Sequence, residues 1–187
     1  PGSADGSTVT GQLELSQATL NAFNIGLPKG SVTGKGLGAF TLNLSKGAEP
    51  ELSLTSDLQG IGLRIDGLGW SKPRAQAGKL EIALQLAKTP VIKGFSIAAA
   101  GLSATGDLTL RPGGGMERAV FSPLRVADRL NSRVELVGRG QGQPVQVLVR
   151  GGTIDIRKFG VGSGGAQTGQ GQGPPLDLAL DSLRVTD

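Results

Sequence analysis

The chain has 187 residues, a formal net charge of +4, and neither cysteine nor histidine. The absence of cysteine excludes disulfide scaffolds and thiolate metal sites, and it leaves the cellular compartment open. No run of about 20 apolar residues occurs, so no segment has the composition of a membrane-spanning helix.

Glycine is unusually abundant, with 32 residues or about 17% of the chain against a usual value of about 7%. The glycines are interleaved with alternating apolar residues rather than collected in one linker, which favours many strands with tight turns over disorder. Alternation of period two is typical of β-strands. In chain order, it predicts strands over residues 8–15, 32–44, 49–55, 61–66, 79–86, 91–99, 102–110, 116–121, 131–137, 145–149, 153–158 and 176–180.

Only two segments favour helix. Residues 17–23 can form a helical turn, and in residues 122–130 a short helix competes with strand. We therefore expect an all-β fold, in the form of an elongated, twisted antiparallel sheet curled into a groove; the alternative is a β-sandwich.

The strand predicted over residues 32–44 has an unusual face. After Val32, its even positions are three glycines followed by apolar side chains, in the order Gly34, Gly36, Gly38, Phe40, Leu42 and Leu44. Because glycines have no side chain, a row of them on one face of a strand allows the strand to bend or another segment to approach closely.

The whole chain, residues 1–187, is expected to be a single β-rich segment of a longer protein. It lacks an initiator Met, begins with Pro1-Gly2-Ser3 and stops in the middle of an alternating strand. Residues 159–175 consist mostly of Gly and Gln, so we expect a mobile loop there.

Side chains two positions apart on a strand point to the same face, so each alternating strand carries an apolar stripe. The clearest stripe is Leu80, Ile82, Leu84 and Leu86, with Glu81 and Gln85 on the opposite side. Collected over all strands, the candidate stripe residues are Phe40, Leu42, Leu44, Leu52, Leu54, Ile61, Leu63, Ile65, Leu80, Ile82, Leu84, Leu86, Phe95, Ile97, Leu108, Leu110, Val134, Leu136, Val145, Val147 and Val149.

Catalytic and cofactor signatures are weak. Without His or Cys, a nucleophile relay would need Ser with Lys or Asp, and Ser71 beside Lys72 fits a turn better than a dyad. A G-x-G-x-x-G pattern in residues 160–165 lacks the helix that a dinucleotide site requires, and Asp177 and Asp181 are expected to face solvent. We expect no enzymatic activity, no cofactor and no metal.

Residues 111–158 carry nine Lys or Arg against four Asp or Glu, an excess of five positive charges. A solvated strand face explains this excess, with anionic headgroups or nucleic acid as alternatives. The chain has one Trp, five Phe and no Tyr, so the aromatic platforms of single-strand binders are missing and we expect no nucleic-acid partner.

Two motifs are embedded in these β-repeats, Gly-Trp-Ser-Lys-Pro at residues 69–73 and Gly-Gly-Thr-Ile-Asp-Ile-Arg at residues 151–157. Together with the order of the strands from about residue 32 onward, they resemble the AsmA-like family of Gram-negative bacteria, the YhdP and TamB group. Members of that family look like long, groove-shaped β-sheets that are anchored at the inner membrane by an N-terminal helix and cross the periplasm. Their apolar groove is proposed to carry phospholipid toward the outer membrane.

The resemblance implies that this chain is one periplasmic segment of such a conduit. The stripe residues would then contact phospholipid acyl chains, and membranes would be reached through parts of the protein outside this chain. The alternative is a structural or adhesive β module with an ordinary buried core and no ligand.

Overall fold

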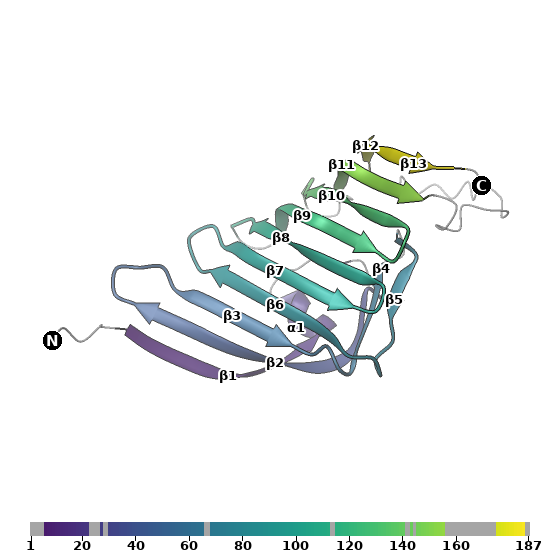
Figure 1. Cartoon of the computed structure of the whole chain (residues 1–187). Helices are drawn as coiled ribbons and strands as arrows, with labels where there is room; N and C mark the ends of the chain where they lie inside the picture. The colour runs from purple at the N-terminus through teal and green to yellow at the C-terminus, as the bar shows by residue number, and fades with distance from the viewer. Residues whose placement is uncertain are drawn as a thin grey trace.

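The computed structural model describes residues 6–22, 27, 30–65, 68–112, 115–140, 143, 145–155 and 175–185. These residues form one open sheet of 13 strands and a single short helix (Figure 1). The all-β fold expected from the alternation is confirmed.

The strands follow the predicted segments closely, except that the turn expected at Ser71 and Lys72 is wrong, because these residues belong to the short strand β5 (Trp70–Lys72). Their bounds are β1 (Gly6–Ser16), β2 (Val32–Ser45), β3 (Glu51–Ser56), β4 (Ile61–Ile65), β5 (Trp70–Lys72), β6 (Gly78–Gln85), β7 (Val91–Ala99), β8 (Leu102–Leu110), β9 (Met116–Val126), β10 (Leu130–Val137), β11 (Gln146–Asp155), β12 (Leu176–Ala179) and β13 (Ser182–Arg184). The helix is α1 (Gln17–Ala22), at the position where the sequence predicts a helical turn.

The strand order is β12-β11-β10-β9-β8-β7-β6-β3-β2-β4-β5, with β1 beside β2 and β13 beside β11. Strands β6 to β11 form an antiparallel meander, because each pairs with the strand that follows it in the chain. Only β12 and β13 depart from the expected antiparallel sheet, since both run parallel to β11. A parallel pair needs a connection of a dozen or more residues, and residues 156–175 between β11 and β12 have that length.

Two predictions for the second half of the chain need correction. The possible helix at residues 122–130 is wrong, because β9 continues to Val126 and a tight turn with Ala127 at φ 45° leads into β10. The separate strands predicted over residues 145–149 and 153–158 are one strand, β11, which passes through Gly151 and Gly152 at positive φ. The predicted loop, residues 159–175, lies outside the described residues except for Pro175.

The sheet folds back on itself at the glycine-rich start of β2. Residues Val32 to Gly34 pair with β4, whereas the rest of the strand pairs with β1 and β3. A Cβ on Gly34 would lie 2.2 Å from the Gly60 carbonyl oxygen, and a Cβ on Gly60 would lie 2.1 Å from the Lys35 carbonyl oxygen. The close backbone approach predicted for this face is therefore confirmed, and only glycine fits there.

The fold-back carries the β4–β5 hairpin across one end of the sheet, at the right-hand ends of the strands in Figure 1. Trp70 on β5 belongs to the main buried cluster, together with Leu102, Val126, Leu130 and residues of β11. The Trp70 Nε1–H donates to the Ala100 carbonyl over 2.9 Å, and Arg129 donates to the Gly69 carbonyl over 3.2 Å. The hairpin is thus fixed to the turns that end β7 and β9.

Candidate functional site

Strand register joins the separate apolar stripes into one surface. Across the first half of the sheet, Leu42 is opposite Leu52, Leu52 is opposite Leu84, and Leu84 is opposite Ile92. Across the second half, Leu108 is opposite Ala119, Val134 is opposite Phe121 and Val149, and Leu136 is opposite Val147. Residues that are directly opposite have Cβ atoms about 5 Å apart and lie on the same face. We call this surface the apolar face.

Most of the predicted stripe residues belong to the apolar face. They are Phe40, Leu42, Leu44, Leu52, Leu54, Leu80, Ile82, Leu84, Phe95, Ile97, Leu108, Leu110, Val134, Leu136, Val147 and Val149. Leu86 and Val145 lie just beyond the ends of β6 and β11.

The three predicted residues of β4 are placed differently. Ile61 is buried in a small cluster with Val32 and Leu58, and Leu63 packs against both buried clusters. Ile65 is exposed. These residues belong to the covering hairpin and not to the sheet that it covers, because β4 pairs with β2 and β5 instead of β6.

The structure adds further members to the apolar face. They are Val9, Leu13, Leu15, Ile92, Leu102, Ala104, Ala119, Phe121, Leu124, Val126, Leu130 and Ile154. Leu124 and Val126 fall outside the strand predicted over residues 116–121, because the register shifts between Ala104 and Gly106 in β8, opposite residues 121–124. A bulge of this kind breaks simple alternation in sequence while keeping the apolar residues on one face.

Exposure of the apolar face changes along the strands. At the edge covered by β4 and β5, Leu102 is 5% exposed and Val126 is 0% exposed. Away from that edge, Leu84 and Leu108 are half-buried, whereas the four residues Ile92, Ala119, Val134 and Val149 are buried. At the opposite edge, Leu44 is 38% exposed and Leu86 is 39% exposed. We call these two sides the covered edge and the open edge.

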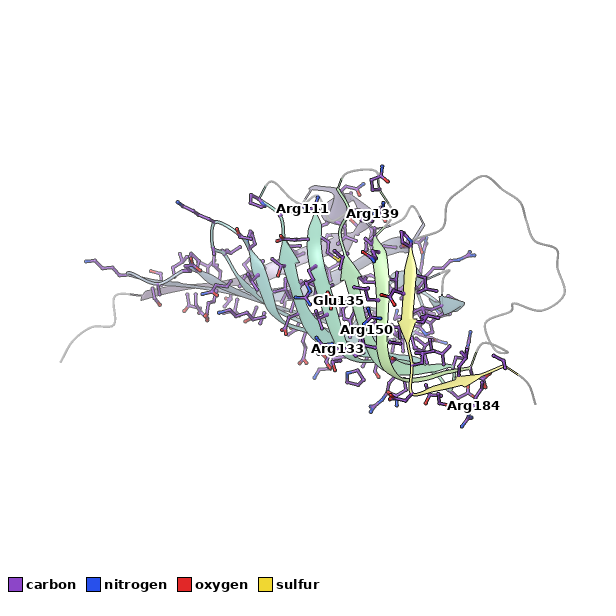
Figure 2. All side chains as sticks on the ribbon, turned by 90° about the horizontal axis from the view of Figure 1, so that it is seen from above. Arg111, Arg133, Glu135, Arg139, Arg150 and Arg184 are labelled. Atoms are coloured by element: carbon purple, nitrogen blue, oxygen red, sulfur yellow. The ribbon has the colours of Figure 1, made fainter. Side chains whose placement is uncertain are left out.

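The other side of the sheet is mostly polar and is tied by ion pairs. Arg118 on β9 pairs with Glu135 on β10 over 2.7 Å, and Arg150 on β11 pairs with Asp177 on β12 through two hydrogen bonds of 2.8 and 3.0 Å. The hydrogen bond from Arg118 lowers the pKa of Glu135, and the one from Arg150 lowers the pKa of Asp177. Figure 2 shows Glu135 close to Arg133 and Arg150 on this polar face.

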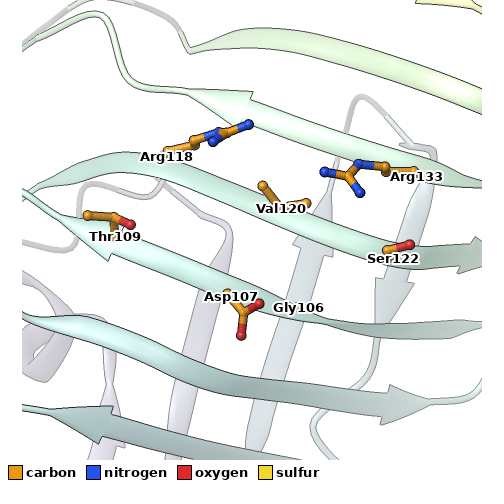
Figure 3. Close-up of a pocket in the computed structure, with 7 residues that line it drawn as sticks. All are labelled: Gly106, Asp107, Thr109, Arg118, Val120, Ser122 and Arg133. Carbon is orange, nitrogen blue, oxygen red and sulfur yellow. The ribbon is translucent and has the colours of Figure 1, made fainter.

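A cavity of about 400 Å³ also lies on the polar face (Figure 3). Its lining comes from β8, β9 and β10 and consists of Gly106, Asp107, Thr109, Arg118, Val120, Ser122 and Arg133. Arg118 is already paired with Glu135, so the cavity offers one guanidinium group, that of Arg133 on β10, and one carboxylate, that of Asp107 on β8, with β9 between them. No side chain that lines it belongs to the apolar face.

The polar residues weighed as catalytic candidates are not assembled for catalysis. Ser71 is exposed and Lys72 is 2% exposed, because adjacent residues of β5 point to opposite sides. The Lys72 ammonium donates to the carbonyls of Leu58 and Ile61 over 2.7 and 2.8 Å, and burial lowers its pKa.

The predicted solvent-facing carboxylates have backbone and side-chain partners. Asp177 binds Arg150, and Asp181 accepts a hydrogen bond of 2.6 Å from the Gly152 amide. Among the described residues, no three Asp or Glu side chains are grouped as a metal site would require. Within the same residues, no helix is long and apolar enough to cross a membrane.

Comparison of the chain with protein-family models, with curated proteins and with solved structures finds no match. The feature of the molecule that bears most directly on function is therefore the apolar face, with its covered edge and its open edge.

Proposed function

We propose that this chain is a segment of a periplasmic hydrophobic-groove protein that binds phospholipid acyl chains and supports lipid transport between the inner and outer membranes. The observation that carries the proposal is the continuous apolar face, which runs by register from β1 to β11 and is covered at only one edge in the described part of the chain.

The size and continuity of this face favour a ligand. Soluble monomers rarely expose contiguous apolar patches larger than a few hundred Å², and larger ones mark interaction sites. On this face, exposed or half-buried Leu, Ile, Val and Phe side chains occupy neighbouring positions on every strand from β1 to β3 and from β6 to β11.

An acyl chain matches the chemistry of the face. Burial of a CH₂ group is worth about 0.8 kcal/mol, so about ten buried CH₂ groups would contribute about 8 kcal/mol without any polar contact. The middle of the apolar face is aliphatic apart from Phe40, Phe95 and Phe121, and the described charged groups lie on the polar face or at the strand ends. Such a surface discriminates little between acyl chains, which suits a protein that carries lipids rather than one that modifies them.

The cellular setting in the proposal comes from the resemblance to AsmA-like proteins. It implies a periplasmic location, an anchor at the inner membrane outside this chain, and movement of phospholipid toward the outer membrane. The curled, one-edge-covered sheet is the shape that this resemblance leads us to expect of a conduit segment.

The rival function is a structural or adhesive module with a dry core. The buried cluster around Trp70, Leu102 and Val126 is the observation in its favour. That cluster extends from the covered edge to Val134 and Val149 on β10 and β11. It does not include Ile82 and Leu84 on β6, which are half-buried.

The proposal is tested by placing a charge on the apolar face. Leu84→Asp and Ile82→Asp are expected to remain folded, because a half-exposed carboxylate stays hydrated, and to lose most of the phospholipid that copurifies with the parent chain. Lipid extraction with phosphate quantification measures the loss, and circular dichroism checks the fold.

Glu81→Ala and Gln85→Ala are the matched controls on the same strand, since both side chains belong to the polar face. They should change neither lipid content nor fold. Asp variants that are folded and carry as much lipid as the parent, or that unfold, would favour the structural module.

A further inference from the structure

The turns at the open edge share a charge pattern. Four connections meet at this edge: residues 46–50 between β2 and β3, 86–90 between β6 and β7, 111–115 between β8 and β9, and 138–145 between β10 and β11. Each contains one basic residue, which is Lys46, Lys88, Arg111 or Arg139 in turn, and together they contain a single acidic residue, Glu49. These four turns therefore carry an excess of three positive charges, beside the exposed carboxylates of Glu51 at the start of β3 and Glu117 near the start of β9.

Each of these cations closely follows a residue of the apolar face. The pairs, separated by one to three positions, are Leu44 and Lys46, Leu86 and Lys88, Leu110 and Arg111, and Leu136 and Arg139. An apolar side chain followed by a cation at the water boundary is the arrangement that suits a lipid tail joined to a phosphate.

The covered edge does not repeat the pattern. Its turns at residues 57–60, 73–77, 100–101 and 127–129 contain two acidic and two basic residues, Asp57, Asp128, Arg74 and Arg129. The positive excess is thus found in the turns at the open edge and not in these turns at the covered edge.

The four cations lie along the same edge of the sheet, on turns that are two strands apart from one to the next. Lys46, Lys88 and Arg139 are exposed, and Arg111 is half-buried. Arg111 Nη2 donates to the Gly138 carbonyl over 2.6 Å, which ties one turn to the neighbouring turn that holds Arg139. Figure 2 shows Arg111 and Arg139 together at this edge of the sheet.

We propose that Lys46, Lys88, Arg111 and Arg139 select phospholipids whose headgroup carries a net negative charge. This inference rests on the proposed function, because it requires acyl chains on the apolar face. With the tails lying along that face, Trp70 and the β4–β5 hairpin block the covered edge, so the headgroup emerges at the open edge beside the cations. A zwitterionic headgroup brings its own ammonium group, which the same cations repel.

The test compares two lipids with identical tails. The full chain is incubated with equimolar mixed vesicles of dimyristoyl phosphatidylglycerol and dimyristoyl phosphatidylcholine, separated by gel filtration, and analysed for bound lipid by mass spectrometry. The parent should carry about five times more phosphatidylglycerol than phosphatidylcholine, the selectivity that one strong exposed ion pair gives. The preference should weaken at about 0.5 M salt because exposed charges are then screened.

The variant K46Q/K88Q/R139Q removes the three exposed cations and keeps Arg111, whose hydrogen bond supports the turn. It should bind both lipids in nearly equal amounts. The control K35Q/K79Q/R125Q removes the same charge from exposed positions on the polar face and should keep the parent's preference.

Each alternative outcome is decisive. A parent that binds both lipids equally, or a K46Q/K88Q/R139Q variant that keeps the parent's preference, overturns the headgroup inference and leaves the proposed function standing. A variant that loses vesicle binding while its ratio of bound lipids stays unchanged also overturns it, in favour of docking on the membrane surface. A parent that binds neither lipid contradicts the proposed function itself.

Discussion

At the scale of single residues, the fold-back of the sheet depends on a buried lysine. The Lys72 ammonium satisfies the carbonyls of Leu58 and Ile61, which lie in the connection between β3 and β4 and at the start of β4. Lys72→Met keeps the length of the side chain and removes its donors. We expect a loss of about 2 to 4 kcal/mol in the free energy of unfolding, measured by urea titration, because buried carbonyls are left unpaired.

The same variant has a pH signature. Burial lowers the pKa of Lys72 below its usual 10.5, although nearby Asp57 opposes the shift. Between the lowered value and 10.5 the unfolded chain binds more protons than the folded chain, so the free energy of unfolding contributed by Lys72 rises with pH in that window. Lys72→Met should lack this rise, and equal pH slopes for parent and variant would contradict the assignment.

Gly60 at the fold-back contributes to the stability of the fold independently of Lys72. Gly60 and Gly47 both have positive φ, at 77° and 80°, but only Gly60 has another backbone segment against its Cα. Gly60→Ala should therefore cost about 3 kcal/mol or more, whereas Gly47→Ala should cost about 1 kcal/mol from backbone strain alone. Thermal unfolding of the two variants gives the comparison, and similar melting temperatures would show that the approach of Gly60 to Lys35 is not tight.

At the scale of elements, the β4–β5 hairpin divides the strands into a covered part and an open part. Val126 at the covered edge is 0% exposed, and Leu84 in the middle of β6 is half-buried. Val126→Asp buries a carboxylate, which a domain stable by about 5 to 15 kcal/mol does not tolerate, so this variant should be unfolded. Leu84→Asp should keep the β-rich circular dichroism spectrum. Equal destabilisation by the two substitutions would show that the whole face is enclosed.

The sequence predicted the strands well because alternation is a local signal. Residues 79–86 and 102–110 show it without interruption, and both are strands with the expected residues on one face. The possible helix at residues 122–130 was wrong because a register shift breaks the alternation there, which no local pattern reveals. The covering hairpin was not predicted either. Trp70 of the hairpin packs with Leu102 and Val126. Contacts between residues so far apart in the sequence produce no periodic pattern from which they could be predicted.

At the scale of the whole molecule, the sandwich alternative would have placed a second sheet over the full apolar face. In the part of the chain that the structure describes, β4 and β5 cover it at one edge, and Leu58 and Leu20 of α1 pack there as well. The long alternating strands form the apolar face, and the glycines of β2 allow the sheet to fold back. Trp70 anchors the β4–β5 hairpin against one edge of that face. We propose that the uncovered part of the apolar face binds lipid.

Native mass spectrometry of the purified parent chain tests this account most directly. After incubation with dimyristoyl phosphatidylglycerol vesicles and gel filtration, the spectrum should contain, beside the unbound chain, a species heavier by the mass of one or more phospholipid molecules. The Leu84→Asp variant should show the unbound mass only, because a charge on the apolar face displaces the acyl chains. A parent chain that shows only its unbound mass under these conditions would contradict the account.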